Sequence, residues 1–127
     1  MINNKVLGTE FEQEFCKLLA SKGYWVHFIV PDSRGAQPFD VVAAKDGKPY
    51  AFDCKTCVAN TFNINRLEDN QITSFELWMR CGNPEPVIAV KHKDDIYYIG
   101  YLELREKRSI KLENQRKQFN QSTECHS

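Results

Sequence analysis

The segment from Pro38 to Thr56, PFDVVAAKDGKPYAFDCKT, constrains the fold more than any other part of the chain. Two apolar stretches, residues 39–44 and 50–55, flank the pair Asp46-Gly47. An Asp-Gly pair in this position favours a tight turn between antiparallel strands. The segment therefore predicts a β-hairpin, and the turn fixes which residues of its two strands face each other.

Each strand of this hairpin carries an aspartate among apolar residues. Antiparallel pairing about the turn places Asp40 directly opposite Asp53, with their Cβ atoms about 5 Å apart. Two carboxylates at that separation repel by roughly 3 kcal/mol at an effective dielectric constant of about 20. Lys55 points to the same face as Asp53, because alternate residues of a strand share a face. We therefore expect a positive charge between the two acids.

Two arrangements supply that charge. Lys55 alone can neutralise one carboxylate, which gives a buried ion pair with no catalytic role. Alternatively, both carboxylates hold a divalent cation, and Lys55 lies beside it to stabilise a reacting water and a phosphate. Oxygen ligands suit Mg²⁺ or Mn²⁺ better than zinc. We favour the metal site, because it uses all three charged groups.

The composition is that of an ordinary globular domain. The 127 residues are 42% hydrophobic and 27% charged, and a chain of this length can bury a core without disulfides. Five irregularly spaced cysteines, without a membrane span or an export signal, indicate reduced thiols in a cytoplasmic protein. The 17 basic and 17 acidic residues balance, so a polyanion must be attracted by local patches or metal ions.

The whole chain predicts one α+β domain in which helices flank a central mixed sheet. Apolar periodicity predicts helices over residues 8–22 and 67–80, and apolar runs predict a largely buried strand over 24–30 and further strands over 86–92 and 96–102. Residues 103–118 are predicted to be helical or frayed. The predicted order is α-β-β-β-α-β-β-α, with a domain over residues 1–110 and a basic, polar C-terminal segment over 111–127 that is helical or partly disordered.

Asp40, Asp53 and Lys55 together resemble the signature of the PD-(D/E)xK nuclease superfamily. Asp53 stands where glutamate is more common, and the proline lies one residue further out, at Pro38. The resemblance implies a restriction-endonuclease-like core and a Mg²⁺-dependent endodeoxyribonuclease, with Mn²⁺ able to substitute. It also implies that Asp40, Asp53 and the backbone carbonyl of Cys54 hold the metal.

Superfamily members commonly draw a further metal-linked glutamate from the first helix, which here offers Glu10, Glu12 and Glu14. Glu12 lies nearest the apolar stripe of that helix. The spacing Gly8-x-x-x-Glu12 is similar to the opening helix of archaeal and RecU-type Holliday-junction resolvases, so we add Glu12 to the catalytic and metal-binding candidates. The alternative is that all three glutamates form a solvated face with favourable first-turn charges.

Gln71 lies within the apolar face of the second helix, because Leu67, Phe75 and Trp78 are at positions i−4, i+4 and i+7. One interpretation is a buried amide bonded to the backbone, and the other is a catalytic contact with the metal-site water or a phosphate. The segment over residues 55–78 resembles the RecU-type resolvases most closely. In those proteins a Lys-x-Thr leads through a polar stretch to a helix with a glutamine.

The candidate DNA-binding residues flank the acids. Ser33 and Arg34 lie in a turn-rich loop before the hairpin, and Thr56 and Arg66 follow it. A flexible arginine suits a phosphate, although ordinary surface loops have the same composition. Basic residues over 105–117 alternate with glutamates, which indicates either a solvated helix face or a further DNA contact.

Other polar motifs carry weaker signals. Cys54-Lys-Thr-Cys57 has CxxC spacing, but it lacks the helix start of a redox motif and the second ligand pair of a zinc site. His27 is interpreted as a core or interface histidine, and His92 lies near a turn. Neither histidine pairs with a nucleophile in a recognisable arrangement.

These observations lead us to expect a Holliday-junction resolvase that acts on four-way DNA junctions in recombination or repair. Resolvases cut two symmetric strands, which implies a homodimer. We expect it in the cytoplasm, at the nucleoid or in the host cytoplasm if a phage encodes it. The alternatives are another superfamily nuclease acting on duplex or flap DNA, and a non-catalytic DNA- or protein-binding module on the same fold.

Overall fold

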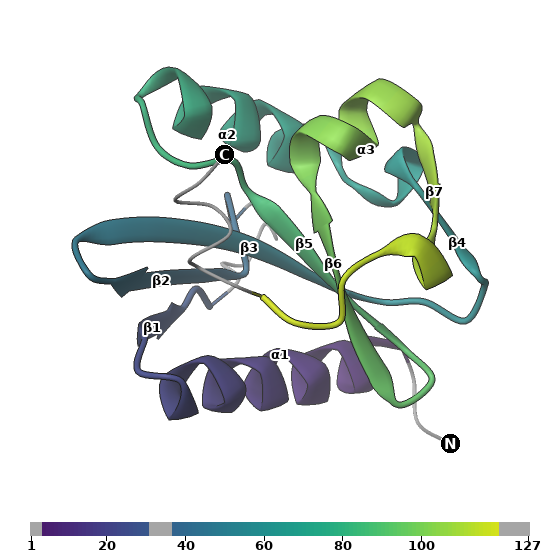
Figure 1. Ribbon diagram of the computed structural model, residues 1–127, viewed down its shortest axis with the longest axis horizontal. Helices are drawn as coiled ribbons and strands as arrows, with labels where there is room; N and C mark the ends of the chain where they lie inside the picture. The colour runs from purple at the N-terminus through teal and green to yellow at the C-terminus, as the bar shows by residue number, and fades with distance from the viewer. Residues whose placement is uncertain (1–3, 31–36, 120–127) are drawn as a thin grey trace.

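The computed structural model describes residues 4–30 and 37–119 (Figure 1). The elements are α1 (Asn4–Ser21), β1 (Trp25–Phe28), β2 (Val41–Lys45), β3 (Lys48–Thr56), β4 (Thr61–Asn63), η1 (Ile64–Arg66), α2 (Asp69–Arg80), β5 (Val87–His92), β6 (Asp95–Gly100), α3 (Tyr101–Lys107), β7 (Ser109–Lys111) and η2 (Leu112–Asn114). The described helices are all too short or too polar to span a bilayer.

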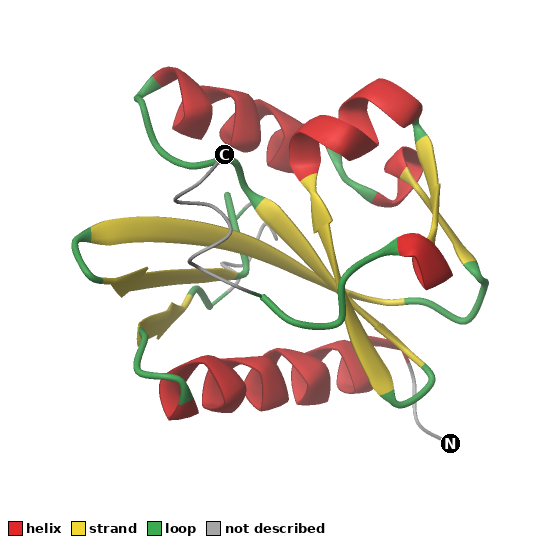
Figure 2. Ribbon diagram, viewed as in Figure 1, coloured by secondary structure: helices red, strands yellow, loops and turns green. Residues whose placement is uncertain are grey.

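The main sheet is mixed and has five strands in the order β1-β2-β3-β5-β6. Its β3–β5 pair is parallel, and the neighbouring pairs are antiparallel. Helix α1 covers one face of the sheet, and α2 and α3 cover the other (Figure 2). The predicted α+β fold with a central mixed sheet between helices is therefore confirmed.

The β2–β3 hairpin has the predicted register, with Val41 opposite Phe52. Asp46 and Gly47 both have positive φ, 53° and 78°, as a tight two-residue hairpin turn requires. The paired ladder ends at Val41. Asp40 lies one residue beyond, at a bend where its N–H donates to the Phe52 carbonyl at 3.1 Å. Asp40 thus leaves the strand just before the position opposite Asp53.

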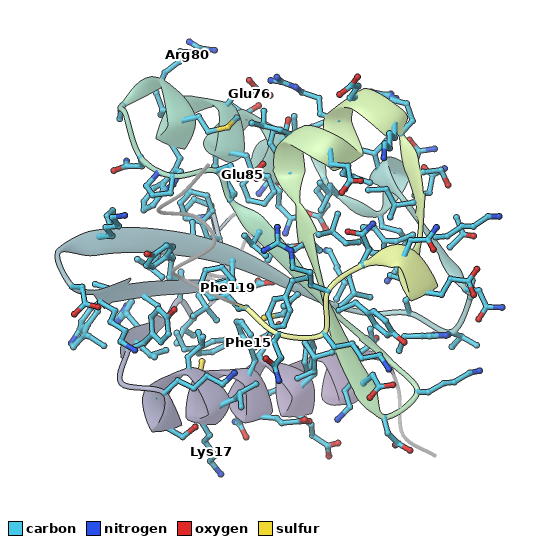
Figure 3. All side chains as sticks on the ribbon, in the orientation of Figure 1. Phe15, Lys17, Glu76, Arg80, Glu85 and Phe119 are labelled. Carbon is cyan, nitrogen blue, oxygen red and sulfur yellow. The ribbon has the colours of Figure 1, made fainter. Side chains whose placement is uncertain are left out.

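Apolar side chains form one core on each face of the sheet. On the α1 side, the Phe52 ring lies 5.0 Å from that of Phe15 and 5.2 Å from that of Phe119 (Figure 3). On the other side, the ring of Phe75 from α2 lies 5.1 Å from that of Tyr101 from α3. Burying one such side chain contributes about 1.5–3 kcal/mol. The two cores pack the hairpin between the helices.

Strand β1 differs from the predicted buried strand. It lies at the edge of the sheet beside β2, and Trp25 on it is 63% exposed. His27 is also exposed and stacks on Trp25, with 6.1 Å between ring centroids, so it is not a core histidine. Aromatic and β-branched residues suit edge and central strands alike, which is why composition did not separate the two.

Residues 103–118, predicted to be helical or frayed, are helical only as far as Lys107 and then form other ordered elements. Helix α3 begins earlier, at Tyr101, and ends where Arg108 adopts a left-handed conformation with φ of 69°. The next residues form β7, which pairs antiparallel with β4 in a small second sheet. Ile110 and Leu112 are buried there, at 4% and 1% exposure. Ile110 and Leu112 alternate with polar residues, which is typical of a half-buried strand. The many charged residues nearby make this short alternation difficult to recognise in the sequence.

Candidate active site

Asp40 and Asp53 come together at the end of the hairpin away from its turn. Asp40 is 5% exposed and Asp53 is 0% exposed. Asp40 Oδ2 accepts a hydrogen bond from the Cys54 N–H at 2.8 Å. This bond ties the Asp40 carboxylate to β3 beside Asp53, even though Asp40 itself lies at a bend outside the ladder.

Asp53 has a donor on one oxygen and a cation near the other. Gln71 Nε2 donates to Oδ1 at 2.5 Å, and Lys55 Nζ lies 3.5 Å from Oδ2. That second distance is an ion pair rather than a well-formed hydrogen bond, and Oδ2 is buried without a hydrogen bond from the described residues. Burial, and then the charge of Asp40, raises the pKa of Asp53 well above its usual value, against the opposing effect of Lys55. Oδ2 thus retains acceptor capacity for a further cation.

Helix α2 positions Gln71 through its first turn. Gln71 Oε1 accepts a hydrogen bond from the Glu68 N–H at 3.0 Å and completes a capping box. Because this bond fixes the amide, Nε2 faces Asp53, and Lys55 Nζ lies 3.5 Å from Oε1. Gln71 is therefore both a buried amide bonded to the backbone and a direct neighbour of the acids.

Helix α1 brings Glu12 to the site. Burial, and then the negative charge of Asp40, raises the pKa of Glu12 to about 7, and Lys55 opposes this shift. Glu10 and Glu14 are exposed, and Glu14 forms an ion pair with Lys91 at 2.5 Å. Among the three glutamates, Glu12 is thus the one whose charge interacts with the acid pair.

The raised pKa values predict that stability without divalent metal falls as pH rises. Between about pH 4.5 and 7 the folded state keeps a proton on Glu12 that the unfolded chain has lost, so unfolding becomes more favourable as pH increases. The raised pKa of Asp53 acts in the same direction. We expect the melting temperature in EDTA to fall over this range by about 3–5 °C more in the wild type than in Glu12→Gln. Circular dichroism melts measure this difference, and Glu10→Gln is the exposed control. Equal slopes for the wild type and Glu12→Gln would contradict the prediction.

The donor set limits which side chains can hold a metal. Within residues 4–30 and 37–119, no group of three or more His, Cys, Asp or Glu side chains is arranged as a metal cluster. Cys16, Cys54, Cys57 and Cys81 are free thiols. Burial, followed by the nearby acids, raises the pKa of the Cys54 thiol, which opposes thiolate ligation. The paired carboxylates of Asp40 and Asp53 are therefore the best donors, and they fit a hard dication.

The predicted DNA contacts are only partly visible. Ser33 and Arg34 lie outside the described residues. Arg66 Nη2 donates to the carbonyl of Thr56, the last residue of β3, at 2.8 Å, and its guanidinium lies 5.4 Å from the centre of the Phe62 ring. Arg66 is exposed. These contacts hold Arg66 and Thr56 together just beyond Lys55.

The basic C-terminal residues favour the solvated-surface interpretation. Three of them form ion pairs with acids: Arg105 with Glu76, Lys107 with Glu103, and Lys117 with Asp95. Figure 3 labels Glu76, which lies on α2 next to α3. His92 is likewise structural, because its ring nitrogens lie 2.8 Å from the Cys57 carbonyl and 3.1 Å from Asn60 Oδ1.

Gln37 belongs to the site although sequence reasoning missed it. Its Nε2 donates to Asp40 Oδ1 at 3.3 Å, and its backbone carbonyl accepts from Asn70 Nδ2 at 3.2 Å. A glutamine at the end of a polar loop carries no periodic signal. Its position three residues before Asp40 is the one feature that could have drawn attention to it.

A helix, a hairpin bearing paired acids and a lysine, and a mixed sheet define the PD-(D/E)xK nuclease class of fold. A model of the archaeal Holliday junction resolvase (Hjc) family matches residues 3–125, and the chain belongs to this family. The superfamily assignment made from Asp40, Asp53 and Lys55 is confirmed. The sequence motifs favoured the RecU-type resolvases first and the archaeal resolvases second, and the matching family model is that of the archaeal type.

Two relatives illustrate the similarity. The chain is 29% identical, over 92 residues and 72% of its length, to the crossover junction endodeoxyribonuclease Hjc of Methanocaldococcus jannaschii. The aligned region spans 64% of that relative. The fold is similar to the structure of Hjc from Archaeoglobus fulgidus, with a TM-score of 0.65, 16% identity, and coverage of 92% of this chain and 97% of that one.

Proposed function

We propose that the protein is a Mg²⁺-dependent endodeoxyribonuclease that resolves four-way DNA junctions. The observation that carries the proposal is the buried Asp40–Asp53 pair with Lys55 3.5 Å from Asp53, in a chain of the Hjc family. The name of the Methanocaldococcus jannaschii relative, a crossover junction endodeoxyribonuclease, supports branched DNA as the substrate.

The acid pair fits a magnesium ion. Asp40 and Asp53 would hold it, with the Cys54 carbonyl, and Glu12 would assist directly or through water. The buried Asp53 Oδ2, which lacks a hydrogen bond from the described residues, supports this assignment. When bound, Mg²⁺ polarises the scissile phosphate and makes a bound water more acidic. Mn²⁺ has the same preference for oxygen ligands and would substitute.

The protein's own side chains have separate roles in phosphodiester hydrolysis. Lys55, whose side chain is 18% exposed, stabilises negative charge that develops on the phosphate. Gln71 holds Asp53 Oδ1 and so orients the carboxylate. In the protein without metal the pKa of Glu12 is raised to about 7, so Glu12 would release its proton when a dication binds beside it. By resemblance to the superfamily, the products carry a 5′-phosphate and a 3′-hydroxyl.

The substrate also implies an assembly. Cutting two symmetric strands of a junction requires two active sites related by a two-fold axis, so we propose a homodimer. Ser33, Arg34, Thr56 and Arg66 are proposed to contact the phosphates of the bound strand. A protein that acts on chromosomal or phage DNA would work in the cytoplasm.

The test is cleavage of a mobile four-way junction beside a linear duplex of the same sequence. With Mg²⁺ we expect paired, symmetric nicks in the junction, formed at least about tenfold faster than any nick in the duplex, because the branch point arranges its strands in a way that a linear duplex does not. EDTA should abolish both. A junction rate no higher than the duplex rate would instead support a nuclease of linear or flap DNA. No cleavage with either Mg²⁺ or Mn²⁺ would support a binding module.

A further inference from the structure

Two buried oxygens at the acid pair accept no hydrogen bond from the described residues: Asp53 Oδ2 and Gln37 Oε1. The proposed cation accounts for Asp53 Oδ2, because a carboxylate oxygen can bind it directly. It does not by itself account for Gln37 Oε1. A buried acceptor without a donor is unfavourable, so we expect Gln37 Oε1 to accept a hydrogen bond from a further group.

The orientation of the Gln37 amide follows from its neighbour. Gln37 Nε2 is the end of the amide that donates to Asp40 Oδ1, at 3.3 Å. The opposite end of the amide is therefore the acceptor oxygen. The backbone carbonyl of Gln37 is held by Asn70 from the first turn of α2, which restrains the residue beside the site.

Gln37 and Gln71 form a matched pair around the two acids. Each amide donates to one carboxylate, Gln37 to Asp40 Oδ1 and Gln71 to Asp53 Oδ1. The oxygen of Gln71 is satisfied by the Glu68 N–H, whereas the oxygen of Gln37 has no donor among the described residues. Gln37 Oε1 is therefore available, among the described residues, to accept a hydrogen bond from a group that enters the site.

We propose that Gln37 is a positioning residue for the metal: it holds Asp40 and accepts, through Oε1, a hydrogen bond from a water in the hydration shell of Mg²⁺. This inference rests on the proposed function. Magnesium usually keeps several of its waters when carboxylates bind it, and those waters are strong donors. Partners that orient metal ligands in this way commonly change metal affinity by 10–100-fold when they are replaced.

The test measures metal binding without DNA. Gln37→Met keeps the length of the side chain and removes both amide groups. We expect calorimetric titration with Mn²⁺ to show about tenfold weaker binding than in the wild type, and a smaller rise in melting temperature on adding Mn²⁺. Gln118→Met, at an exposed position, is the matched control and should bind Mn²⁺ like the wild type.

The outcomes separate this inference from the proposed function. If Gln37→Met binds Mn²⁺ within twofold of the wild type, or is merely less stable in EDTA, Gln37 is a structural residue and the inference is overturned. The proposed function then still stands, provided that Asp53→Asn loses Mn²⁺ binding. A wild type that neither binds Mn²⁺ nor cuts DNA overturns both.

A second variant covers the case in which Gln37→Met does not fold. Asn70→Ala removes the restraint on the Gln37 carbonyl and alters no hydrogen bond to either acid. We expect it to weaken Mn²⁺ binding in the same direction, by about threefold. Unchanged Mn²⁺ affinity in a folded Asn70→Ala protein would overturn the inference.

Discussion

Asp53→Asn is expected to lower the junction cleavage rate by at least about 10³-fold and to raise the melting temperature in EDTA. The rate falls because an amide is a poor ligand for the cation that stabilises charge in the transition state. The stability rises because burial and the neighbouring Asp40 disfavour ionisation of Asp53, a free-energy cost that asparagine does not have, and because asparagine keeps an oxygen to accept from Gln71. A gain of about 1 kcal/mol corresponds to about 3–6 °C for a domain of this size.

Two measurements check this prediction: single-turnover cleavage with Mg²⁺ and thermal melts in EDTA. Asp95→Asn is the matched control, because Asp95 is exposed and pairs with Lys117 at 3.2 Å. Such a surface pair contributes little to stability. The electrostatic explanation is rejected if Asp53→Asn keeps more than a tenth of the wild-type rate or melts below the wild type in EDTA.

The acid pair could be found from the sequence because charged residues are rare in apolar strands. The Asp46-Gly47 turn fixed the register, and the alternation of side chains then placed Lys55 on the face of Asp53. What the register did not reveal is the bend at Asp40. There a hydrogen bond from the Cys54 N–H, rather than strand pairing, brings the carboxylates together.

Helical periodicity was similarly sufficient to choose Glu12. Its position beside the apolar stripe of α1 follows from spacing alone, and the structure places its charge near Asp40 and Lys55. Gln71 stood out for the same reason, as a polar residue on an apolar face. Both residues could be found because regular elements give each position a known direction.

The features that sequence reasoning missed depend on contacts between distant segments. Strand β7 forms because residues 109–111 pair with β4. The local sequence of this charged stretch does not indicate which strand it pairs with. Gln37 joins the site because its backbone carbonyl accepts a hydrogen bond from Asn70 of α2. The edge position of β1 is set by the strand order of the sheet, which its aromatic composition does not encode.

Lys55→Met is expected to reduce cleavage by about 10²–10³-fold and, in contrast to Asp53→Asn, to lower stability in EDTA. The ammonium is the cation nearest to a fully buried carboxylate, at 3.5 Å from Asp53 Oδ2. Removing one partner of a buried pair costs about 3–5 kcal/mol, and the 18% exposure of Lys55 reduces our expectation to about 2 kcal/mol. Lys91→Met, on the neighbouring strand, removes an exposed pair with Glu14 and should cost less than about 1 kcal/mol.

The double variant Asp53→Asn/Lys55→Met tests whether the two groups act on each other. If Lys55 stabilises the fold mainly by compensating Asp53, its removal should cost at least about 1 kcal/mol less when Asp53 is already neutral. Urea unfolding of the four proteins in EDTA gives this coupling energy. Additivity within about 0.3–0.5 kcal/mol would mean that Lys55 does not compensate Asp53. Coupling in EDTA that disappears with saturating Mn²⁺ would show that the dication takes over the compensation of the acids.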